Sequence, residues 1–236
     1  MMQPIFPPEF ARLLAPKRTR RKKVRKGGPG SADEPLPPLE HHAVLIALDI
    51  SSTCTGYAVA SVRQGVPDVS RCGLIRPRAT DRPWERIMQI TEECRSIVWT
   101  TLQSEAIHRD PPNHVRVVLE WSEGHIHRGH SGHGLAVTGQ AQGTVWENLR
   151  HIAPVDLVGD DVWTRNLDTN TRPKKEHRSL WAYANVRVYR EHAGAPSVRD
   201  GTITFPNDPG YDVGDAVALA CWRCAIAAGQ KGILWK

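Results

Sequence analysis

The chain has 236 residues, of which 40% are hydrophobic, and its formal net charge is +6. This length allows one large domain or two small ones, with enough apolar residues for a core. No apolar run approaches the roughly 20 residues of a membrane-spanning helix, and no apolar segment follows Met1-Met2-Gln3-Pro4, so we expect neither a membrane protein nor a secretory signal. Five cysteines without framework spacing indicate a reducing compartment.

Residues 1–42 carry most of the excess positive charge. They hold nine Lys or Arg against four Asp or Glu, a net charge of +5, whereas the remainder holds 22 against 21, a net charge of +1. Like charges repel and the Pro/Gly-rich flanks bury little, so we expect a flexible arm over 1–42 and a folded domain over 43–236. We expect the arm to neutralise nucleic-acid phosphates, and a solubilising tail or a nuclear-import signal are the alternatives. The arm residues assigned to phosphate contact are Lys17, Arg18, Arg20, Arg21, Lys22 and Lys23.

Hydrophobic patterning predicts three strands, a helix and a fourth strand in the first half of the domain. The strands Val44–Asp49, Tyr57–Arg63 and Val69–Leu74 are joined by short turns and form a meander. An apolar stripe with a period of 3.6 residues predicts a helix over 81–104, and Val115–Glu120 is the fourth strand.

A loop rich in Gly and His follows the fourth strand, over 121–134. Its histidines are irregularly spaced and have no Cys nearby, which favours contact with a nucleic-acid backbone over a zinc site. Arg128 is the cation of this loop that we assign to such contact. A histidine that activates water near a metal is a further alternative.

The second half of the domain alternates strand and helix. The expected elements are a helix over Leu135–His151, a strand over Val155–Val158, a turn or helix start over Asp161–Arg165, a helix from Pro173 to Glu191, an irregular region over 193–211 and a last helix over 212–228. Hairpin strands followed by this alternation predict an α/β fold with a mixed five-stranded sheet flanked by helices.

Aromatic and cysteine residues within the helices are assigned mainly to the core. The lone CxxC of Cys221 and Cys224 has no second pair, so core packing is favoured over a zinc or redox site. Helical tryptophans serve a core or an interface, and we expect the core for most of them. These tryptophans are Trp84, Trp99, Trp146 and Trp181.

Four carboxylates lie at the ends of apolar strands or in the first turn of an apolar helix. Asp49 and Glu120 end strands, while Asp212 and Asp215 are three residues apart in the first turn of the last helix and share a face. If the two strands are parallel neighbours, all four carboxylates meet and repel one another unless cations neutralise them. Oxygen ligands suit Mg²⁺ or Mn²⁺, and two such ions perform phosphodiester hydrolysis. The alternatives are turn-forming Asp residues and an N-cap at Asp212.

Four blocks of this sequence resemble the RuvC-type Holliday-junction resolvases of bacteria, which belong to the RNase H-like superfamily. The first runs from Leu48-Asp49 to Ala58-Val59, and the second is Cys72-Gly73-Leu74-Ile75-Arg76. The third joins Leu119-Glu120 with Gly139-Gln140-Ala141-Gln142-Gly143, and the fourth is the helix start from Asp212 to Ala220. The blocks follow one another in the family's order between about residue 43 and residue 228.

The resemblance implies an RNase H-like fold and a homodimeric endonuclease that nicks two opposed strands of a four-way DNA junction. It implies two Mg²⁺ ions, with Mn²⁺ as a substitute, held by Asp49, Glu120, Asp212 and Asp215. It also implies that Lys174 or Lys175 lies near the scissile phosphate, and we assign both to DNA contact and Lys175 to catalysis. We therefore expect a cytoplasmic, nucleoid-associated protein, with a nuclear or organellar location as the alternative because of the basic arm. The sequence identifies no recombination or replication protein as a partner.

Departures from the family's pattern leave other functions open. Ile50 and Ser51 replace the Pro-Gly that usually follows the first acidic residue, and Trp121 is the only aromatic residue near the loop that contacts the junction in the family. The alternatives are an RNase H-like nuclease for other branched DNA or RNA/DNA, an actin-like kinase or ATPase, and a non-catalytic nucleic-acid-binding protein. Retention of all four carboxylates favours an enzyme over a non-catalytic protein. A kinase or ATPase is disfavoured, because the second half of the sequence shows no Gly-rich nucleotide site.

Overall fold

The computed structural model describes residue 36 and residues 43–63, 66–108, 114–121, 132–165, 174–200 and 202–227. The basic residues assigned to the arm, Arg128 and most of the loop over 121–134 lie outside these residues, so their predicted DNA contacts stay predictions. Within the described part, no helix combines the length and apolarity that crossing a membrane requires.

Five strands form one mixed sheet in the order β3-β2-β1-β4-β5. β1 (Val44–Ile50), β2 (Thr55–Arg63) and β3 (Val66–Ile75) are antiparallel neighbours, as the meander predicts. β4 (Val115–Trp121) pairs parallel to β1, and β5 (Val155–Gly159) pairs parallel to β4. The predicted mixed five-stranded sheet is confirmed, and the topology is that of the RNase H-like fold.

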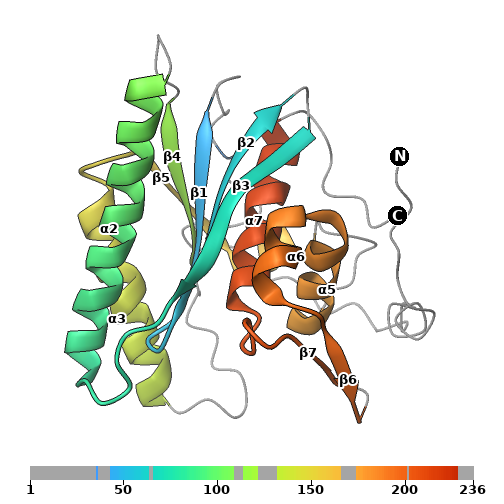
Figure 1. Cartoon of the computed structure of the whole chain (residues 1–236). Coiled ribbons are helices and arrows are strands. Elements are labelled where there is room, and N and C mark those ends of the chain that lie inside the picture. Colours follow the sequence, from blue (N-terminus) through green and yellow to red (C-terminus); the bar gives the residue numbers. More distant parts are fainter. Residues whose placement is uncertain are drawn as a thin grey trace.

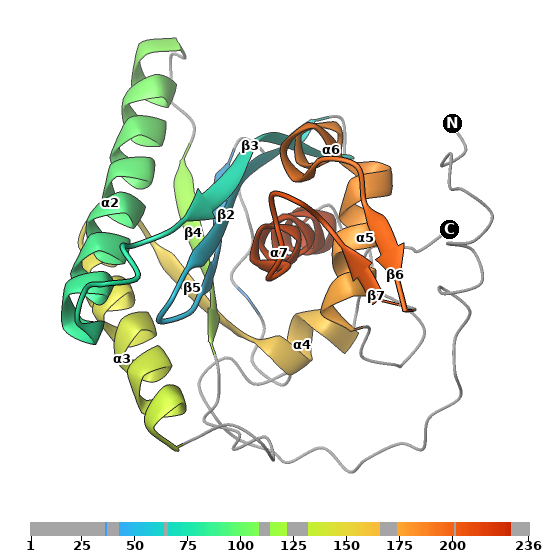
Figure 2. The ribbon, with the colours of Figure 1, turned by 60° about the horizontal axis from the view of Figure 1, so that its bottom comes forward.

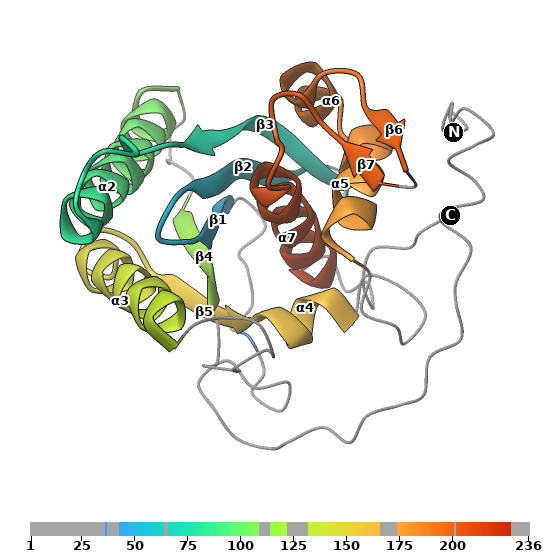
Figure 3. The same ribbon diagram turned by 90° about the horizontal axis from the view of Figure 1, so that it is seen from below.

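Helices cover both faces of the sheet (Figures 1 and 3). α2 (Pro83–His108) and α3 (Gly132–Leu149) lie on one face. α7 (Asp212–Ala227) lies on the other face against β1, β2 and β3, with α5 (Lys175–Asn185) packed against α7 and α6 (Arg187–Ala193) against β3. The sheet is therefore buried on both sides, which fits the continuous apolar runs of its parallel strands.

Alternation along β1 divides the core into two clusters. Leu45 and Ala47 belong to the cluster on the α7 side, whereas Ile46 and Leu48 belong to the cluster on the side of α2 and α3. Because side chains alternate across a strand, Asp49 points to the α7 side with Leu45 and Ala47. This alternation determines on which face a carboxylate site can form.

The chain departs from the predicted elements between residues 160 and 211. The turn or helix start expected after β5 is the short helix α4 (Asp160–Arg165). The single helix expected over 173–191 is two helices, because Val186 has an extended backbone, with φ −118° and ψ 108°, that ends α5. The region expected to be irregular contains a small antiparallel hairpin of β6 (Ser197–Arg199) and β7 (Thr202–Thr204).

The prediction that most of the four helical tryptophans belong to the core is wrong for α2. Trp181 is buried and Trp146 is partly buried against the core, but Trp84 and Trp99 expose 58% and 51% of their surface. Cys221 and Cys224 are free and buried on α7, which confirms the core role assigned to the CxxC pair.

Candidate active site

Strand register brings the first two carboxylates together. In the parallel pairing of β1 with β4, Leu48 is opposite Leu119, so Asp49 and Glu120 follow at adjacent positions at the carboxyl ends of the strands. On β4, Val118 belongs to the core on the α7 side and Leu119 to the other core, so Glu120 points to the α7 side as Asp49 does. Both side chains are buried, with 8% and 9% exposed.

A glycine on β2 allows α7 to reach this pair. Gly56 is directly opposite Asp49 in the antiparallel ladder, so both residues face the same side of the sheet. A Cβ atom at Gly56 would lie 1.9 Å from the backbone oxygen of Asp212. The start of α7 therefore lies directly on β2 (Figure 2) and places Asp212 and Asp215 beside Asp49.

Another acidic residue caps α7. The carboxylate of Asp208 accepts hydrogen bonds from the backbone N–H groups of Val213 and Gly214, at 3.2 and 2.9 Å, and from the hydroxyl of Tyr189, at 2.8 Å. The N-cap function considered for Asp212 thus belongs to Asp208, four residues earlier. The carboxylate of Asp212 turns instead towards the site.

Lys175 contacts three of the four carboxylates. Its Nζ atom lies 3.4 Å from Asp49 Oδ2, 3.3 Å from Asp212 Oδ1 and 3.3 Å from Asp215 Oδ2. The negative charge of Asp49 is the largest cause that holds the pKa of Lys175 well above its usual value. Lys174 has a largely exposed side chain that pairs with Glu176 at 3.6 Å. The structure thus separates the two lysines, and Lys175 is the one within the carboxylate cluster.

One face of α5 carries the groups that meet α7. Lys175, Arg178 and Ser179 are three and four residues apart and share that face. Gly214 of α7 allows the close approach, because a Cβ atom there would lie 2.1 Å from Ser179 Oγ. Side chains of α5 therefore reach the carboxylates, because α5 packs closely against the first turn of α7.

Two site residues were missed from the sequence. Arg178 donates from Nε and from a terminal nitrogen to the two oxygens of Asp215, each at 2.6 Å. Trp163 of α4 donates from Nε1 to Glu120 Oε2 at 3.1 Å, and the Arg178 guanidinium lies 5.0 Å from the centre of its ring. The three-residue spacing from Lys175 was a signal for Arg178, but no sequence pattern marked Trp163.

Side chains also hold the turn after Asp49. The Ser51 hydroxyl donates to the backbone oxygen of Cys54 at 2.8 Å and accepts from its N–H at 3.1 Å. Cys54 Sγ then donates to Asp212 Oδ2 at 2.9 Å. Burial, followed by the bond to Asp212, raises the pKa of the Cys54 thiol to about 11, so it remains a donor at neutral pH.

Negative charge exceeds positive charge in this cluster. Burial raises the pKa of Asp49 to about 6, with Lys175 opposing the shift and Asp215 and Asp212 adding to it. Burial also raises the pKa of Glu120 well above its usual range, and the charge of Asp49 adds to the effect. Four carboxylates face two cationic side chains, so further positive charge would be favourable here.

The donor chemistry of the cluster fits Mg²⁺ or Mn²⁺. Its carboxylate oxygens are the hard ligands that these ions prefer. Among the described residues, however, no three His, Cys, Asp or Glu side chains are arranged as ligands of a single ion. The ammonium group of Lys175 lies among the carboxylates instead, so an ion that binds there has to displace it.

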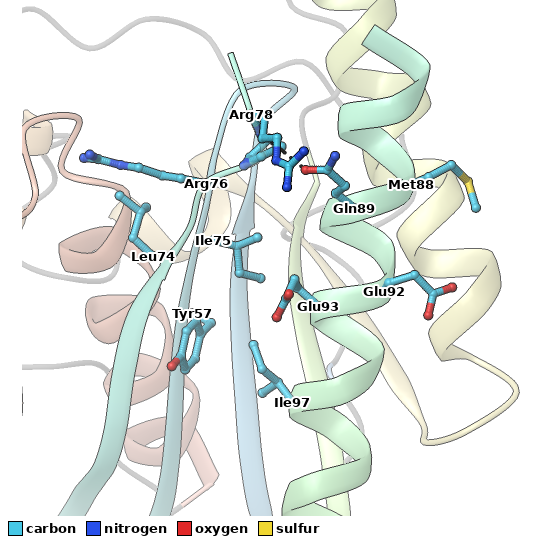
Figure 4. A pocket seen from close by; sticks show the side chains of 11 residues that line it. Tyr57, Leu74, Ile75, Arg76, Arg78, Met88, Gln89, Glu92, Glu93 and Ile97 are labelled. Carbon is cyan, nitrogen blue, oxygen red and sulfur yellow. Dashed lines mark hydrogen bonds between the residues drawn. The ribbon is translucent and has the colours of Figure 1, made fainter. Parts of the chain in front are cut away.

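A separate hollow lies between β3 and α2, with a volume of about 810 Å³ (Figure 4). Arg76 and Arg78 line it on one side, and Glu92 and Glu93 of α2 line it on the other. This mixed lining selects no charged ligand. The hollow is on the side of α2, whereas the four carboxylates are on the side of α7.

No family model and no curated protein matches the sequence. Solved structures similar to this chain include two of RuvC and one of a Holliday junction resolvase. RuvC of T. thermophilus in complex with a Holliday junction substrate is 17% identical, with 82% of this chain and 100% of that chain covered and a TM-score of 0.48. The yeast mitochondrial resolvase Ydc2 is 9% identical, with 84% of each chain covered and a TM-score of 0.47. A further structure of Thermus thermophilus RuvC is 16% identical, with 79% and 95% covered and a TM-score of 0.46. The activity of this chain is therefore argued from its own residues.

Proposed function

We propose that this protein is a metal-dependent endonuclease that resolves four-way DNA junctions by paired symmetric nicks. The observation that carries the proposal is the convergence of four carboxylates from β1, β4 and α7 around Lys175. Acidic clusters of this kind bind the divalent ions that hydrolyse phosphodiesters. The four sequence blocks that resemble RuvC-type resolvases point to a junction as the substrate.

The residues of the cluster have distinct roles in this proposal. Asp49, Glu120, Asp212 and Asp215 hold two Mg²⁺ ions, for which Mn²⁺ can substitute. When bound, such ions activate the attacking water and stabilise the leaving oxygen. The Lys175 ammonium neutralises negative charge that develops on the phosphoryl oxygens.

DNA reaches the site along the edge of the sheet where the strands end. β3 runs parallel to β1, so Arg76 and Arg78, which directly follow β3, lie at the same edge as Asp49. Both arginines are exposed. We propose that they contact phosphates on either side of the cut, together with Lys174, Arg128 and the basic arm.

A homodimer supplies the second nick. A four-way junction is nearly two-fold symmetric, so a two-fold dimer presents one site to each of two opposed strands. The exposed residues Trp84, Met88 and Trp99 lie on one face of α2. Met88 follows Trp84 by four residues, and Trp99 follows Met88 by about three full helical turns. Antiparallel pairing of two copies of α2 would place Trp84 of one copy against Trp99 of the other.

We expect Trp99→Glu to give monomers in light scattering, and a monomeric wild-type protein would contradict this proposal.

Substrate choice tests the proposed function. A labelled four-way junction, a fork, a flap, a linear duplex and an RNA/DNA hybrid are incubated with the full chain and Mg²⁺. Symmetric nicking of the junction supports the proposal, whereas preference for another shape assigns the site to that substrate. Junction binding without cleavage of any substrate would show a non-catalytic binding protein.

Removal of residues 1–42 tests the arm. We expect weaker binding to every DNA shape and a smaller dependence of affinity on salt, because fewer phosphate contacts release fewer counterions. Unchanged affinity and salt dependence would show that the arm does not bind DNA.

A further inference from the structure

We infer that Trp163 and Arg178 are positioning residues that hold Glu120 and Asp215 as the fixed half of the site. This inference rests on the proposed function, because it concerns how the same carboxylates are prepared for divalent ions. Neither residue contacts DNA or an ion in this account, and each acts through the carboxylate that it holds.

Arg178 holds Asp215 in one orientation. Its Nε atom and a terminal nitrogen bind one carboxylate oxygen each, both at 2.6 Å, which is the fork geometry of a bidentate pair. Arg178 is 3% exposed and Asp215 is fully buried. Lysine carries the same charge but lacks the planar fork, so it cannot fix both oxygens.

Trp163 holds Glu120 from a different element. Its indole N–H donates to Glu120 Oε2 at 3.1 Å, and the whole side chain is buried on α4. The ring also lies 5.0 Å from the Arg178 guanidinium, a cation–π contact. A continuous series of contacts thus runs from Asp215 through Arg178 and Trp163 to Glu120.

This series joins four elements that are distant in the sequence. It connects α7 to α5, then to α4 and then to β4, and so fixes the distance between one carboxylate on a strand and one on the last helix. Partners that orient ligand side chains affect ion affinity or activity by about 10- to 100-fold when they are removed. A role limited to stability would not change ion affinity.

Two substitutions test the inference. Trp163→Phe keeps an aromatic ring beside Arg178 but removes the N–H donor to Glu120. Arg178→Lys keeps the positive charge but removes the fork. The matched control is Trp222→Phe, because Trp222 is 2% exposed in the same core and its Nε1 atom has no hydrogen-bond partner among the described residues.

The measurements are Mn²⁺ affinity by electron paramagnetic resonance on metal-stripped protein without DNA, the thermal midpoint, and kcat and KM for junction cleavage. We expect Trp163→Phe and Arg178→Lys to weaken Mn²⁺ binding and to lower kcat by about tenfold each, with KM for the junction unchanged. Trp222→Phe should lower the thermal midpoint alone.

The outcomes separate this inference from the proposed function. Wild-type protein that binds no Mn²⁺ overturns the proposed function and this inference with it. If the wild type binds Mn²⁺ and the affinities of Trp163→Phe and Trp222→Phe are equal, the role of Trp163 is overturned while the proposed function stands. If Trp163→Phe does not fold, Arg178→Lys decides, because wild-type affinity and kcat in that variant would show that only the charge matters.

Discussion

The four carboxylates form two pairs that the protein holds in different ways. Glu120 and Asp215 are bound by Trp163 and Arg178, whose side chains belong to the core. Asp49 and Asp212 are bound by Lys175, whose side chain is 46% exposed and also contacts Asp215. Asp212 is bound by the half-buried Cys54 as well. One pair is therefore part of the packed interior, whereas the other contacts groups that can move without disturbing the core.

This difference assigns separate tasks to the two halves of the site. A buried Arg–carboxylate pair is costly to break, because either partner alone would leave an uncompensated charge in the interior. A lysine near the surface can exchange its carboxylates for phosphate oxygens by rotation of its flexible stem, without disturbing the core. The buried half sets geometry, and the exposed half is where ions and DNA replace the contacts of Lys175.

Gly56→Ala should have the largest effect, because it moves Asp212 and Asp215 of α7 away from Asp49 and Glu120 of the sheet and so divides both pairs. The added Cβ would meet the backbone oxygen of Asp212 at 1.9 Å, and backbone cannot rotate away as a side chain can. We expect α7 to shift from the sheet, with cleavage lost and the free energy of unfolding reduced by about 1–3 kcal/mol or more. Cleavage assays and denaturant titrations measure the two effects.

Gly139→Ala on α3 is the control for this substitution. An added Cβ there meets nothing within 4 Å, so it should leave cleavage unchanged and stabilise the helix by about 0.5–1 kcal/mol. Equal behaviour of the two alanine variants would show that α7 does not depend on Gly56.

Lys175→Met removes the cation that contacts Asp49, Asp212 and Asp215. We expect cleavage to fall by about 100-fold, because the cation for the phosphoryl group is lost. Mn²⁺ affinity without DNA should rise at the same time, since Lys175 no longer competes for three carboxylates. Lys174→Met is the matched control and should be close to wild type in both assays. Weaker Mn²⁺ binding in Lys175→Met would contradict the competition.

The pH dependence of stability sharpens the comparison further. Burial raises the pKa of Asp49 from 3.8 to about 6. A carboxyl with a raised folded pKa stabilises the fold when protonated, so this contribution is complete below pH 3.8 and is lost as the pH rises through about 6. The thermal midpoint of metal-free protein should fall as the pH rises from about 4 to about 6. Asp49→Asn should make this fall smaller, and an unchanged slope would show that Asp49 does not titrate there.

Cys54 should give the smallest effect. Cys54→Ser retains a donor near Asp212, so we expect cleavage within about threefold of wild type. Cys54→Ala removes the donor and should cost about 1 kcal/mol of stability. A large loss of cleavage in Cys54→Ser would show that the thiol itself is required.

Much of the site was predictable because each carboxylate stands at the end of an apolar element. The ends of parallel strands share one sheet edge, which brings Asp49 and Glu120 together once the strands pair. The spacing of Asp212 and Asp215 predicts a shared helical face. Gly56 carried no such signal, because its role depends on the backbone of α7 crossing β2.

The remaining features depend on tertiary contacts that no local pattern encodes. Trp163 becomes a site residue only because α4 follows β5, whose neighbour β4 carries Glu120. The break at Val186 interrupts a pattern that is helical on both sides, since its backbone is extended where α5 ends. The apolar period of α2 predicted burial for Trp84, but one side of this helix is exposed in the single chain.

Ion binding by the carboxylates is the central claim, and the number of Mn²⁺ ions bound per chain tests it most directly. Metal-stripped wild type and Asp49→Asn are titrated with Mn²⁺ and followed by electron paramagnetic resonance, with circular dichroism to show that both are folded. The account predicts two bound ions in the wild type and loss of at least one in the variant. Equal numbers of ions bound with equal affinity would contradict it.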